Sequence, residues 1–142
     1  MSAPSLVYSC EIQVRWGDSD RLGHVNNTRI VEYLQEARPL FLAEGAASVD
    51  TAPGAAVVRK MDAEFLRPIT ATSGTVRVTV SVVHLGTSSF TLRHVIEDAD
   101  GNVCASGDAL MVAFDVRAER SRPLTEPERA VLGRYLPAAA PA

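Results

Sequence analysis

The chain has 142 residues, which is most simply one domain with a hydrophobic core of its own. Its hydrophobic content of 46% and charged content of 22% are typical of a soluble globular protein. The formal net charge of −3 gives no reason to expect a nucleic-acid partner. No run of residues is apolar enough to cross a membrane and the N-terminus shows no secretory signal, so the cytoplasm is the expected compartment.

The N-terminal part of the chain predicts one strand and one long helix. Residues 7–16 mix β-forming with polar residues and predict the strand. The helix is expected over about 27–44, because apolar residues recur there at steps of four, three and four. These residues are Ile30, Leu34, Ala37 and Phe41. Pro39 lies inside that helix, where it removes a hydrogen bond, and therefore predicts a kink or a break near Arg38.

The rest of the chain predicts β-structure with a short closing helix. Strands are expected over residues 55–66, 75–85, 90–96 and 103–116. The run of Asp, Gly and Asn at 98–102 predicts a hairpin turn. Small residues alternate along one side of the last strand, where they would let a helix or another chain come close: Ala105, Gly107, Ala109 and Ala113. The short helix is expected to be capped at Thr125.

This order of elements predicts an α+β fold, with one long helix against a mostly antiparallel sheet of about five strands. A single domain is expected over residues 1–142, with an ordered core at about 6–136. Residues 1–5 are expected to be a disordered lead-in and residues 46–54 a flexible connection. One helix covers only one face of such a sheet, so the long last strand is expected to offer an edge or a face for dimerisation.

A polar loop between the first strand and the long helix carries the candidate chemistry. It holds two carboxylates, one imidazole and two amides: Asp18, Asp20, His24, Asn26 and Asn27. The loop leads into the helix N-terminus, whose first N–H groups lack partners within the helix and carry partial positive charge. Such a loop could polarise a carbonyl group and attack it. The alternative is that these are ordinary loop residues, with Asn26 or Asn27 acting only as a helix cap.

Other polar and aromatic residues are interpreted as structural. Asp18 is expected to accept hydrogen bonds from loop N–H groups, and Gly23 to permit a turn that a Cβ would block. Trp16 is expected in the core or in an interface. His84 and His94 lie in predicted strands with no second ligand at metal spacing, so no metal site is expected.

Four short segments carry a resemblance to a known family. They are Gly17-Asp18-Ser19-Asp20-Arg21-Leu22-Gly23-His24-Val25-Asn26-Asn27 with the later Glu36-Ala37-Arg38, then Glu64-Phe65-Leu66-Arg67-Pro68, and then Leu85-Gly86-Thr87-Ser88-Ser89-Phe90. Together they resemble the hotdog-fold acyl-CoA thioesterases of the 4-hydroxybenzoyl-CoA thioesterase type. The His-Val-Asn-Asn portion also resembles the plant acyl-ACP thioesterase motif, so the carrier of the acyl group is either CoA or acyl carrier protein.

The resemblance implies a hotdog fold and hydrolysis of a thioester to a free acid and a thiol. It makes Asp20 the catalytic carboxylate, as general base or nucleophile, and Asn27 the source of the N–H that binds the thioester oxygen. His24 stands where the family often has an aromatic or apolar residue, and is expected either to take part in catalysis or to orient its neighbours. An alkyl thiol has a pKa of about 8.5, so the thiolate leaves without a strong acid to protonate it.

Substrate contacts are expected from Gly23, Val25, Asn26, Arg67, Ser88 and Ser89. No cofactor is expected, because coenzyme A is part of the substrate. A homodimer or homotetramer with the active site at the dimer interface is expected, because one helix on one sheet encloses too little volume for the acyl group by itself. The alternative function, on the same fold, is a non-catalytic hotdog module that binds an acyl thioester or a partner protein.

Overall fold

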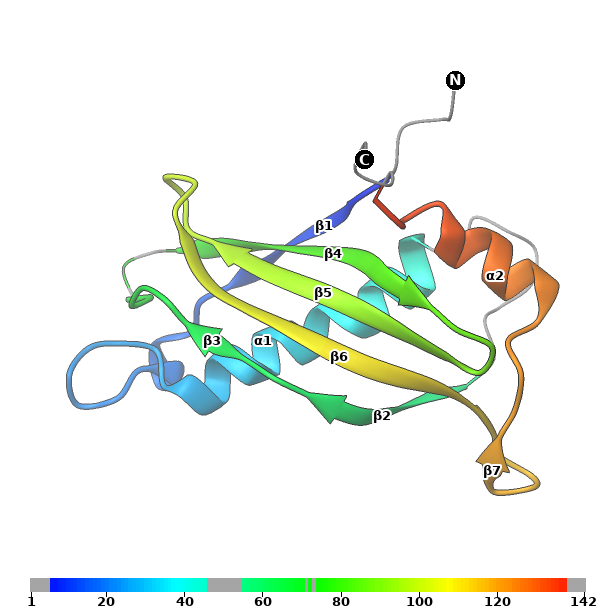
Figure 1. Ribbon diagram of the computed structural model, residues 1–142. Helices are drawn as coiled ribbons and strands as arrows, with labels where there is room; N and C mark the ends of the chain where they lie inside the picture. Colours follow the sequence, from blue (N-terminus) through cyan, green and yellow to red (C-terminus); the bar gives the residue numbers. More distant parts are fainter. Residues whose placement is uncertain (1–5, 46–54, 71, 73, 138–142) are drawn as a thin grey trace.

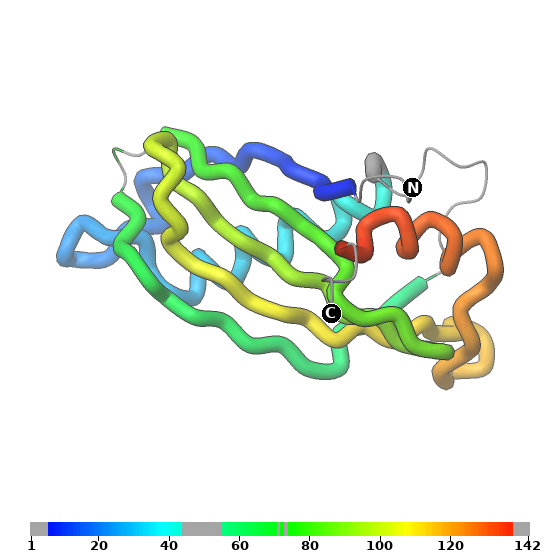
Figure 2. Tube along the Cα trace, turned by 45° about the horizontal axis from the view of Figure 1, so that its top comes forward, coloured from blue at the N-terminus to red at the C-terminus, as the bar shows by residue number. Residues whose placement is uncertain are grey.

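An antiparallel sheet curls around one long helix in the computed structural model (Figure 1). The residues that it describes are 6–45, 55–70, 72 and 74–137. The lead-in expected over residues 1–5 and the connection expected over 46–54 lie outside the described residues. Seen from a second direction, the helix runs along one face of the sheet and leaves the other face uncovered (Figure 2).

The elements follow one another in the predicted order. They are β1 (Tyr8–Gln13), a 3₁₀ turn (Trp16–Asp18), α1 (Asn27–Leu40), a π-helical turn (Phe41–Gly45), β2 (Ala56–Met61), β3 (Glu64–Phe65), β4 (Thr75–Leu85), β5 (Ser89–Glu97), β6 (Val103–Asp115), β7 (Arg120–Ser121) and α2 (Glu126–Gly133). The strand order across the sheet is β1-β4-β5-β6-β2, and β3 and β7 also pair with β6. The expected α+β architecture is confirmed.

Two expectations about the strands need correction. The strand expected over residues 55–66 is broken at Asp62 and Ala63 into β2 and β3, both of which pair with β6. The long strand β6 is not an edge, because β5 lies on one side of it and β2 on the other. The edges of the main path are β1 and β2, so these are the strands that a second chain could extend.

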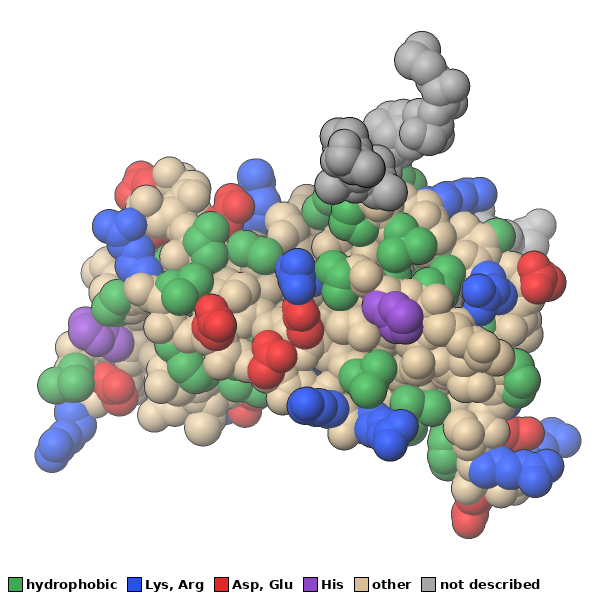
Figure 3. Space-filling view, in the orientation of Figure 1, with side chains coloured by type: hydrophobic (Ala, Val, Ile, Leu, Met, Phe, Trp, Pro, Cys, Tyr) green, Lys and Arg blue, Asp and Glu red, His purple; other side chains and the backbone are tan. Residues whose placement is uncertain are grey.

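The two faces of the sheet differ in the way that alternation along a strand predicts. In β4 every second residue is buried against the helix: Val76, Val78, Val80 and Val82. The opposite face mixes charged, polar and hydrophobic side chains (Figure 3). Trp16 is 86% exposed in the single chain, so the expectation that it lies in the core is wrong and only the interface alternative remains.

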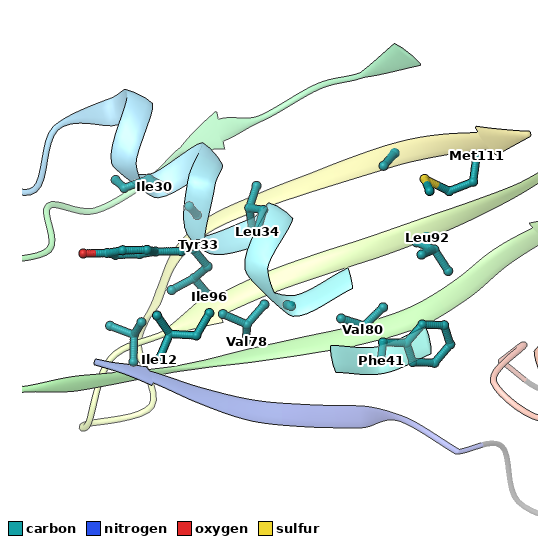
Figure 4. Packing of buried hydrophobic residues seen from close by; sticks show 14 of the residues in the cluster. Ile12, Ile30, Tyr33, Leu34, Phe41, Val78, Val80, Leu92, Ile96 and Met111 are labelled. Carbon is teal, nitrogen blue, oxygen red and sulfur yellow. The ribbon is translucent and has the colours of Figure 1, made fainter. Parts of the chain in front are cut away.

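The helix α1 begins at its predicted N-terminus and buries its predicted apolar face. Asn26 is the N-cap, and its side-chain oxygen accepts a hydrogen bond from the N–H of Thr28 at 2.9 Å. The buried side chains of the helix meet those of the strands in one hydrophobic cluster (Figure 4). The α-helix passes through Pro39 to Leu40 and then widens into the π-helical turn. The irregularity therefore follows Pro39 rather than preceding it at Arg38.

The small residues of β6 let the helix come close, as predicted. A methyl group on Gly107 would lie only 3.2 Å from Cδ1 of Leu34 on α1.

The short helix α2 is capped by Thr125, as expected, and Glu128 completes a capping box with this residue. Arg122 pairs with Glu128 at 2.8 Å and ties the start of α2 to the preceding chain.

Candidate active site

The loop between β1 and α1 is closed at its base and carries Asp20. The carbonyl oxygen of Asp18 accepts a hydrogen bond from the N–H of Asn26 at 2.9 Å. Further out, the N–H of Asp20 donates to the carbonyl oxygen of His24 at 2.8 Å. The two arms of the loop therefore face each other, with Asp20 on one arm and His24 on the other.

The two carboxylate oxygens of Asp20 have different surroundings. Its Oδ1 accepts hydrogen bonds from the N–H groups of Leu22 at 2.8 Å and His24 at 3.4 Å. Gly23 makes this tight turn possible with a φ of +79°, as predicted, because an L side chain rarely adopts that conformation. Within the part of the chain that is described, Oδ2 accepts no hydrogen bond. This oxygen is therefore available to accept a hydrogen bond from a water molecule or to attack a carbonyl carbon.

A cleft of about 220 Å³ opens beside this loop, between the first turn of α1 and the segment that follows β3. Its lining consists of Asp20, His24, Val25, Asn27, Ile30, Phe65, Leu66, Arg67 and Pro68. The N–H of Val25 donates to the carbonyl oxygen of Ile69 at 2.7 Å and so joins the two walls. The structure thus brings together five of the predicted site residues, namely Asp20, His24, Val25, Asn27 and Arg67.

Asn27 contributes the first N–H of α1 to this cleft. The N-cap side chain of Asn26 satisfies the N–H of Thr28, and the carbonyl oxygen of Asn26 takes the N–H groups of Arg29 and Ile30. The N–H of Asn27 donates to no group among the described residues. An unpaired N–H at the positive end of a helix dipole is suited to bind a carbonyl oxygen that gains negative charge.

Two predicted substrate contacts lie in the loop but outside the cleft lining. Gly23 shapes the turn, and the side chain of Asn26 is occupied by Thr28, whose hydroxyl lies 2.7 Å from it. This supports the capping interpretation of Asn26 that the sequence left open.

Two further predicted contacts lie at the other end of the sheet. Ser88 lies in the turn between β4 and β5, and Ser89 is the first residue of β5. The carbonyl oxygen of Ser89 accepts the N–H of Gly86 at 2.7 Å. In Figure 1 this turn and the Asp20 loop lie at opposite ends of the molecule. Within one chain, therefore, the structure does not bring these serines to the cleft.

Sequence reasoning assigned no site role to the apolar residues of the lining. They are Ile30, Phe65, Leu66 and Pro68. Phe65 is 44% exposed and Leu66 is 58% exposed beside this polar cleft, which only the folded chain reveals. The one sequence signal for both residues is their place in the segment 64–68 that carries the family resemblance, in which Arg67 alone is predicted as a contact.

Asp18 is structural, as expected, but its partners are not the expected ones. Its carboxylate binds side chains, since Oδ2 accepts the hydroxyl of Tyr33 at 2.5 Å and Nε of Arg15 at 3.2 Å. The loop N–H groups instead bind Asp20. Burial raises the pKa of the Asp18 carboxyl, whereas the hydrogen bonds from Tyr33 and Arg15 together lower it by more. The net effect is a pKa below the ordinary value, so Asp18 is an anion at neutral pH.

Two features are absent from the residues that the structure describes. No three His, Cys, Asp or Glu side chains in the described ranges are grouped closely enough to hold a metal ion. None of the helices seen in those ranges combines the length and the apolar character needed to span a membrane.

The chain is similar to known proteins in both sequence and fold. A family model described as the thioesterase-like superfamily matches residues 14–132. A thioesterase from Thermus thermophilus, solved in complex with coenzyme A and Zn, is 30% identical with a TM-score of 0.76, and the match covers 90% of this chain and 98% of that one. The PA2801 protein of Pseudomonas aeruginosa is 31% identical with a TM-score of 0.76, covering 87% of this chain and 96% of that one.

A further relative, the protein YsmA of Bacillus subtilis, is 25% identical over 122 residues, which are 86% of this chain and 82% of its own length. The hotdog fold and the resemblance to the 4-hydroxybenzoyl-CoA thioesterase type are confirmed by these matches. Because the family model spans most of the chain, this protein belongs to the thioesterase-like superfamily.

Proposed function

We propose that the chain is an acyl-CoA thioesterase that hydrolyses its substrate to a free acid and coenzyme A in the cleft beside Asp20. The observation that carries the proposal is that Asp20 and Asn27 line one cleft, each with an unused polar group. Membership of the superfamily supports a thioester hydrolase. The relative solved with coenzyme A supports CoA as the carrier of the acyl group.

The proposed chemistry needs one base or nucleophile and one oxyanion site. The N–H of Asn27 binds the thioester oxygen, and the dipole of α1 stabilises the negative charge that develops there. Asp20 either takes a proton from the attacking water or attacks the carbonyl carbon itself. A positioned base contributes roughly 10²–10⁴-fold, and a single oxyanion donor is worth about 2.7–4 kcal/mol. Because a thiolate is a good leaving group, no strong acid is required.

His24 has two proposed roles that differ in which part of the residue acts. Its backbone makes two hydrogen bonds with Asp20, because its carbonyl oxygen accepts the N–H of Asp20 and its N–H donates to the Asp20 carboxylate. Its side chain is half-buried and lines the cleft, where the imidazole is available to the acyl thioester. In the first role the backbone of His24 fixes the Asp20 carboxylate. In the second role the imidazole contacts the substrate.

We also propose that two copies of the chain complete the pocket. A cleft of about 220 Å³ is smaller than the roughly 300–1,000 Å³ typical of small-molecule sites. The edge strand β2, the strand β3 and the residue after it expose Val57, Val58, Phe65 and Leu66 along the same edge of the sheet. Pairing of two copies along this edge would bury these side chains and close one side of the cleft. In such an assembly Ser88 and Ser89 contact substrate only from the second copy.

Release of thiol from a panel of short-chain, long-chain and aromatic acyl-CoAs tests the proposal. Wild type is expected to release CoA, and Asp20→Asn to lose about 10²–10⁴-fold in rate while it keeps its fold. Asp108→Asn is the matched control, because that carboxylate pairs with Arg93 at 3.0 Å on the outer face of the sheet. Full activity in Asp20→Asn would remove Asp20 from the mechanism.

The same experiment separates the alternatives. Release from acyl carrier protein thioesters but from none of the CoA esters would change the carrier and keep the reaction. Tight binding of acyl-CoA with no release by wild type would favour a non-catalytic binding module.

A further inference from the structure

Asp18 is a buried carboxylate that the proposed reaction does not use. It is 7% exposed and lies outside the cleft lining. Three side chains converge on it: the Tyr33 hydroxyl at 2.5 Å and Arg15 Nε at 3.2 Å reach Oδ2, and Arg29 Nε lies 3.7 Å from Oδ1. A carboxylate with this many charged and neutral donors is held in one position.

Arg15 ties the same carboxylate to a second point on the helix. Its Nη2 donates to Oε1 of Glu36 at 2.7 Å, and its guanidinium lies 5.5 Å from the centre of the Tyr33 ring. Arg15 comes directly before the 3₁₀ turn, whereas Tyr33 and Glu36 belong to α1. The guanidinium therefore links the end of the first strand region to the helix through Asp18.

Tyr33 anchors the Asp18 carboxylate to the hydrophobic cluster. Its ring is fully buried in the hydrophobic cluster, and in Figure 4 its oxygen points out of that cluster, toward the end of α1 that the loop joins. Burial and the hydrogen bond to Asp18 both raise the pKa of the Tyr33 hydroxyl, so it remains a donor at neutral pH. The ring cannot shift without disturbing the core, and the carboxylate is therefore anchored to a rigid group.

The backbone of Asp18 connects this anchor to the cleft. Its carbonyl oxygen accepts the N–H of Asn26, which immediately precedes Asn27, and Asp20 follows Asp18 by two residues. A displacement of Asp18 would thus change the separation between the Asp20 carboxylate and the Asn27 N–H. Misplacement of a reacting group by about 1 Å can cost about 10²-fold in rate.

We propose that Arg15, Asp18 and Tyr33 form a loop clamp whose function is to hold Asp20 opposite the N–H of Asn27. The three are positioning residues, because they act through the loop and do not line the cleft. Their catalytic effect rests on the proposed thioesterase activity. Their effect on the loop does not, and it can be measured without turnover.

The kinetic test uses two variants that conserve shape, Tyr33→Phe and Asp18→Asn. Each is expected to lower kcat by about 10–100-fold with KM changed by no more than about twofold, because substrate contacts are intact. The double variant is expected to be no slower than the slower single variant, because the residues act as one unit. Asp108→Asn, which breaks an ion pair away from the loop, is expected to keep the wild-type kcat.

The second readout is amide hydrogen exchange at Leu22 and His24, whose N–H groups bind the Asp20 carboxylate. Exchange is expected to be faster in both clamp variants and unchanged in Asp108→Asn. Because this signal needs no substrate, it tests the clamp even if wild type releases no thiol from any CoA ester, a result that would count only against the proposed function.

Three outcomes would overturn the clamp. One is wild-type kcat and wild-type exchange in folded Tyr33→Phe and Asp18→Asn. Another is a rise in KM without faster exchange, which would make these residues substrate contacts. The third is an equal loss of kcat in Asp108→Asn, which would mean that the loss of kcat comes from general destabilisation of the protein. If Tyr33→Phe does not fold, Asp18→Asn and Arg15→Met carry the same test.

Discussion

Nδ1 of His94 on β5 lies 3.1 Å from the carbonyl oxygen of Gly107 on β6. A carbonyl only accepts, so Nδ1 carries the proton and donates it. Nε2 is then a bare acceptor, buried without a partner among the described residues. Burial is the main cause that lowers the pKa of His94 to about 4, with a further lowering by Arg38, while the Gly107 carbonyl opposes the shift. The structural role expected of His94 follows from this neutral, buried state.

His94 should make the stability of the protein fall on mild acidification. Its pKa is about 4 in the folded protein and 6.5 ordinarily, so the unfolded chain takes up the proton first as the pH falls. The free energy of unfolding is expected to drop by about 3 kcal/mol between pH 6.5 and pH 4 from this group alone. Denaturant unfolding of wild type and His94→Gln at pH 7 and pH 4 measures the drop.

The glutamine variant keeps a donor for the Gly107 carbonyl but cannot take up a proton. Its loss of stability between pH 7 and pH 4 is therefore expected to be smaller than that of wild type. Acidic groups with lowered pKa values, such as Asp18 and Glu128, contribute equally to both proteins. Equal losses in the two proteins would contradict the assignment to His94.

Gly107 should not tolerate a side chain. A Cβ there would collide with the carbonyl oxygen of Asp62, in the connection between β2 and β3, and would press on Leu34 of α1. Backbone atoms cannot move aside as a flexible side chain can, so Gly107→Ala is expected to cost about 1–3 kcal/mol of stability. Chemical denaturation measures the cost. Gly133→Ala, where a Cβ would meet nothing within 4 Å, is expected to be close to neutral.

Gly107 also shows how far the sequence could predict the fold. Periodicity predicted β4, β5, β6 and α1, because alternation and helical spacing record directly which side of an element is buried. The helix α2 was predicted from its capping residue Thr125. The close approach at Gly107 was predicted from residue size alone. The break at Asp62 was not, because it depends on how the connection between β2 and β3 packs against Gly107 of β6, which no local pattern encodes.

Only part of the candidate site could be predicted, again because a local pattern does not encode contacts between distant segments. Asp20, His24 and Asn27 lie in one short segment, so their proximity follows from the sequence alone. The apolar wall that includes Phe65 comes from a distant segment and needs the tertiary structure. The partners of Asp18 were also missed, because Tyr33 fits the apolar stripe of the helix and nothing in the stripe reveals where its hydroxyl points.

Gly23 should be replaceable only at a cost in backbone strain. Its φ is +79°, and a Cβ there would meet nothing within 4 Å, so strain rather than crowding is the obstacle. Gly23→Ala is expected to lower the free energy of unfolding by about 1–2 kcal/mol, and Gly23→Asn by less, because Asn adopts the left-handed conformation more readily. Gly17→Ala is the matched control, since that position is equally open and has no positive φ. An equal cost at both glycines would contradict this explanation.

Arg67 should bind the phosphates of coenzyme A at the rim of the cleft. Its backbone N–H is anchored to the carbonyl oxygen of Cys104 at 3.0 Å, while its exposed guanidinium forms no ion pair with any described residue. A hydrogen bond to a charged group is worth about 1.5–3 kcal/mol. Arg67→Met is therefore expected to raise KM for an acyl-CoA about tenfold or more, with kcat nearly unchanged. Steady-state kinetics measure both constants.

An acyl-pantetheine thioester is the matched control for Arg67, because it presents the same thioester and pantetheine arm without the phosphates of CoA. Arg67→Met is expected to leave KM for this substrate at the wild-type value. The KM of wild type for acyl-CoA should also rise with salt more steeply than that of the variant, because salt screens an exposed guanidinium–phosphate contact. An equal rise in KM for both substrates would mean that Arg67 shapes the cleft wall beside Phe65 and Pro68 and does not bind phosphate.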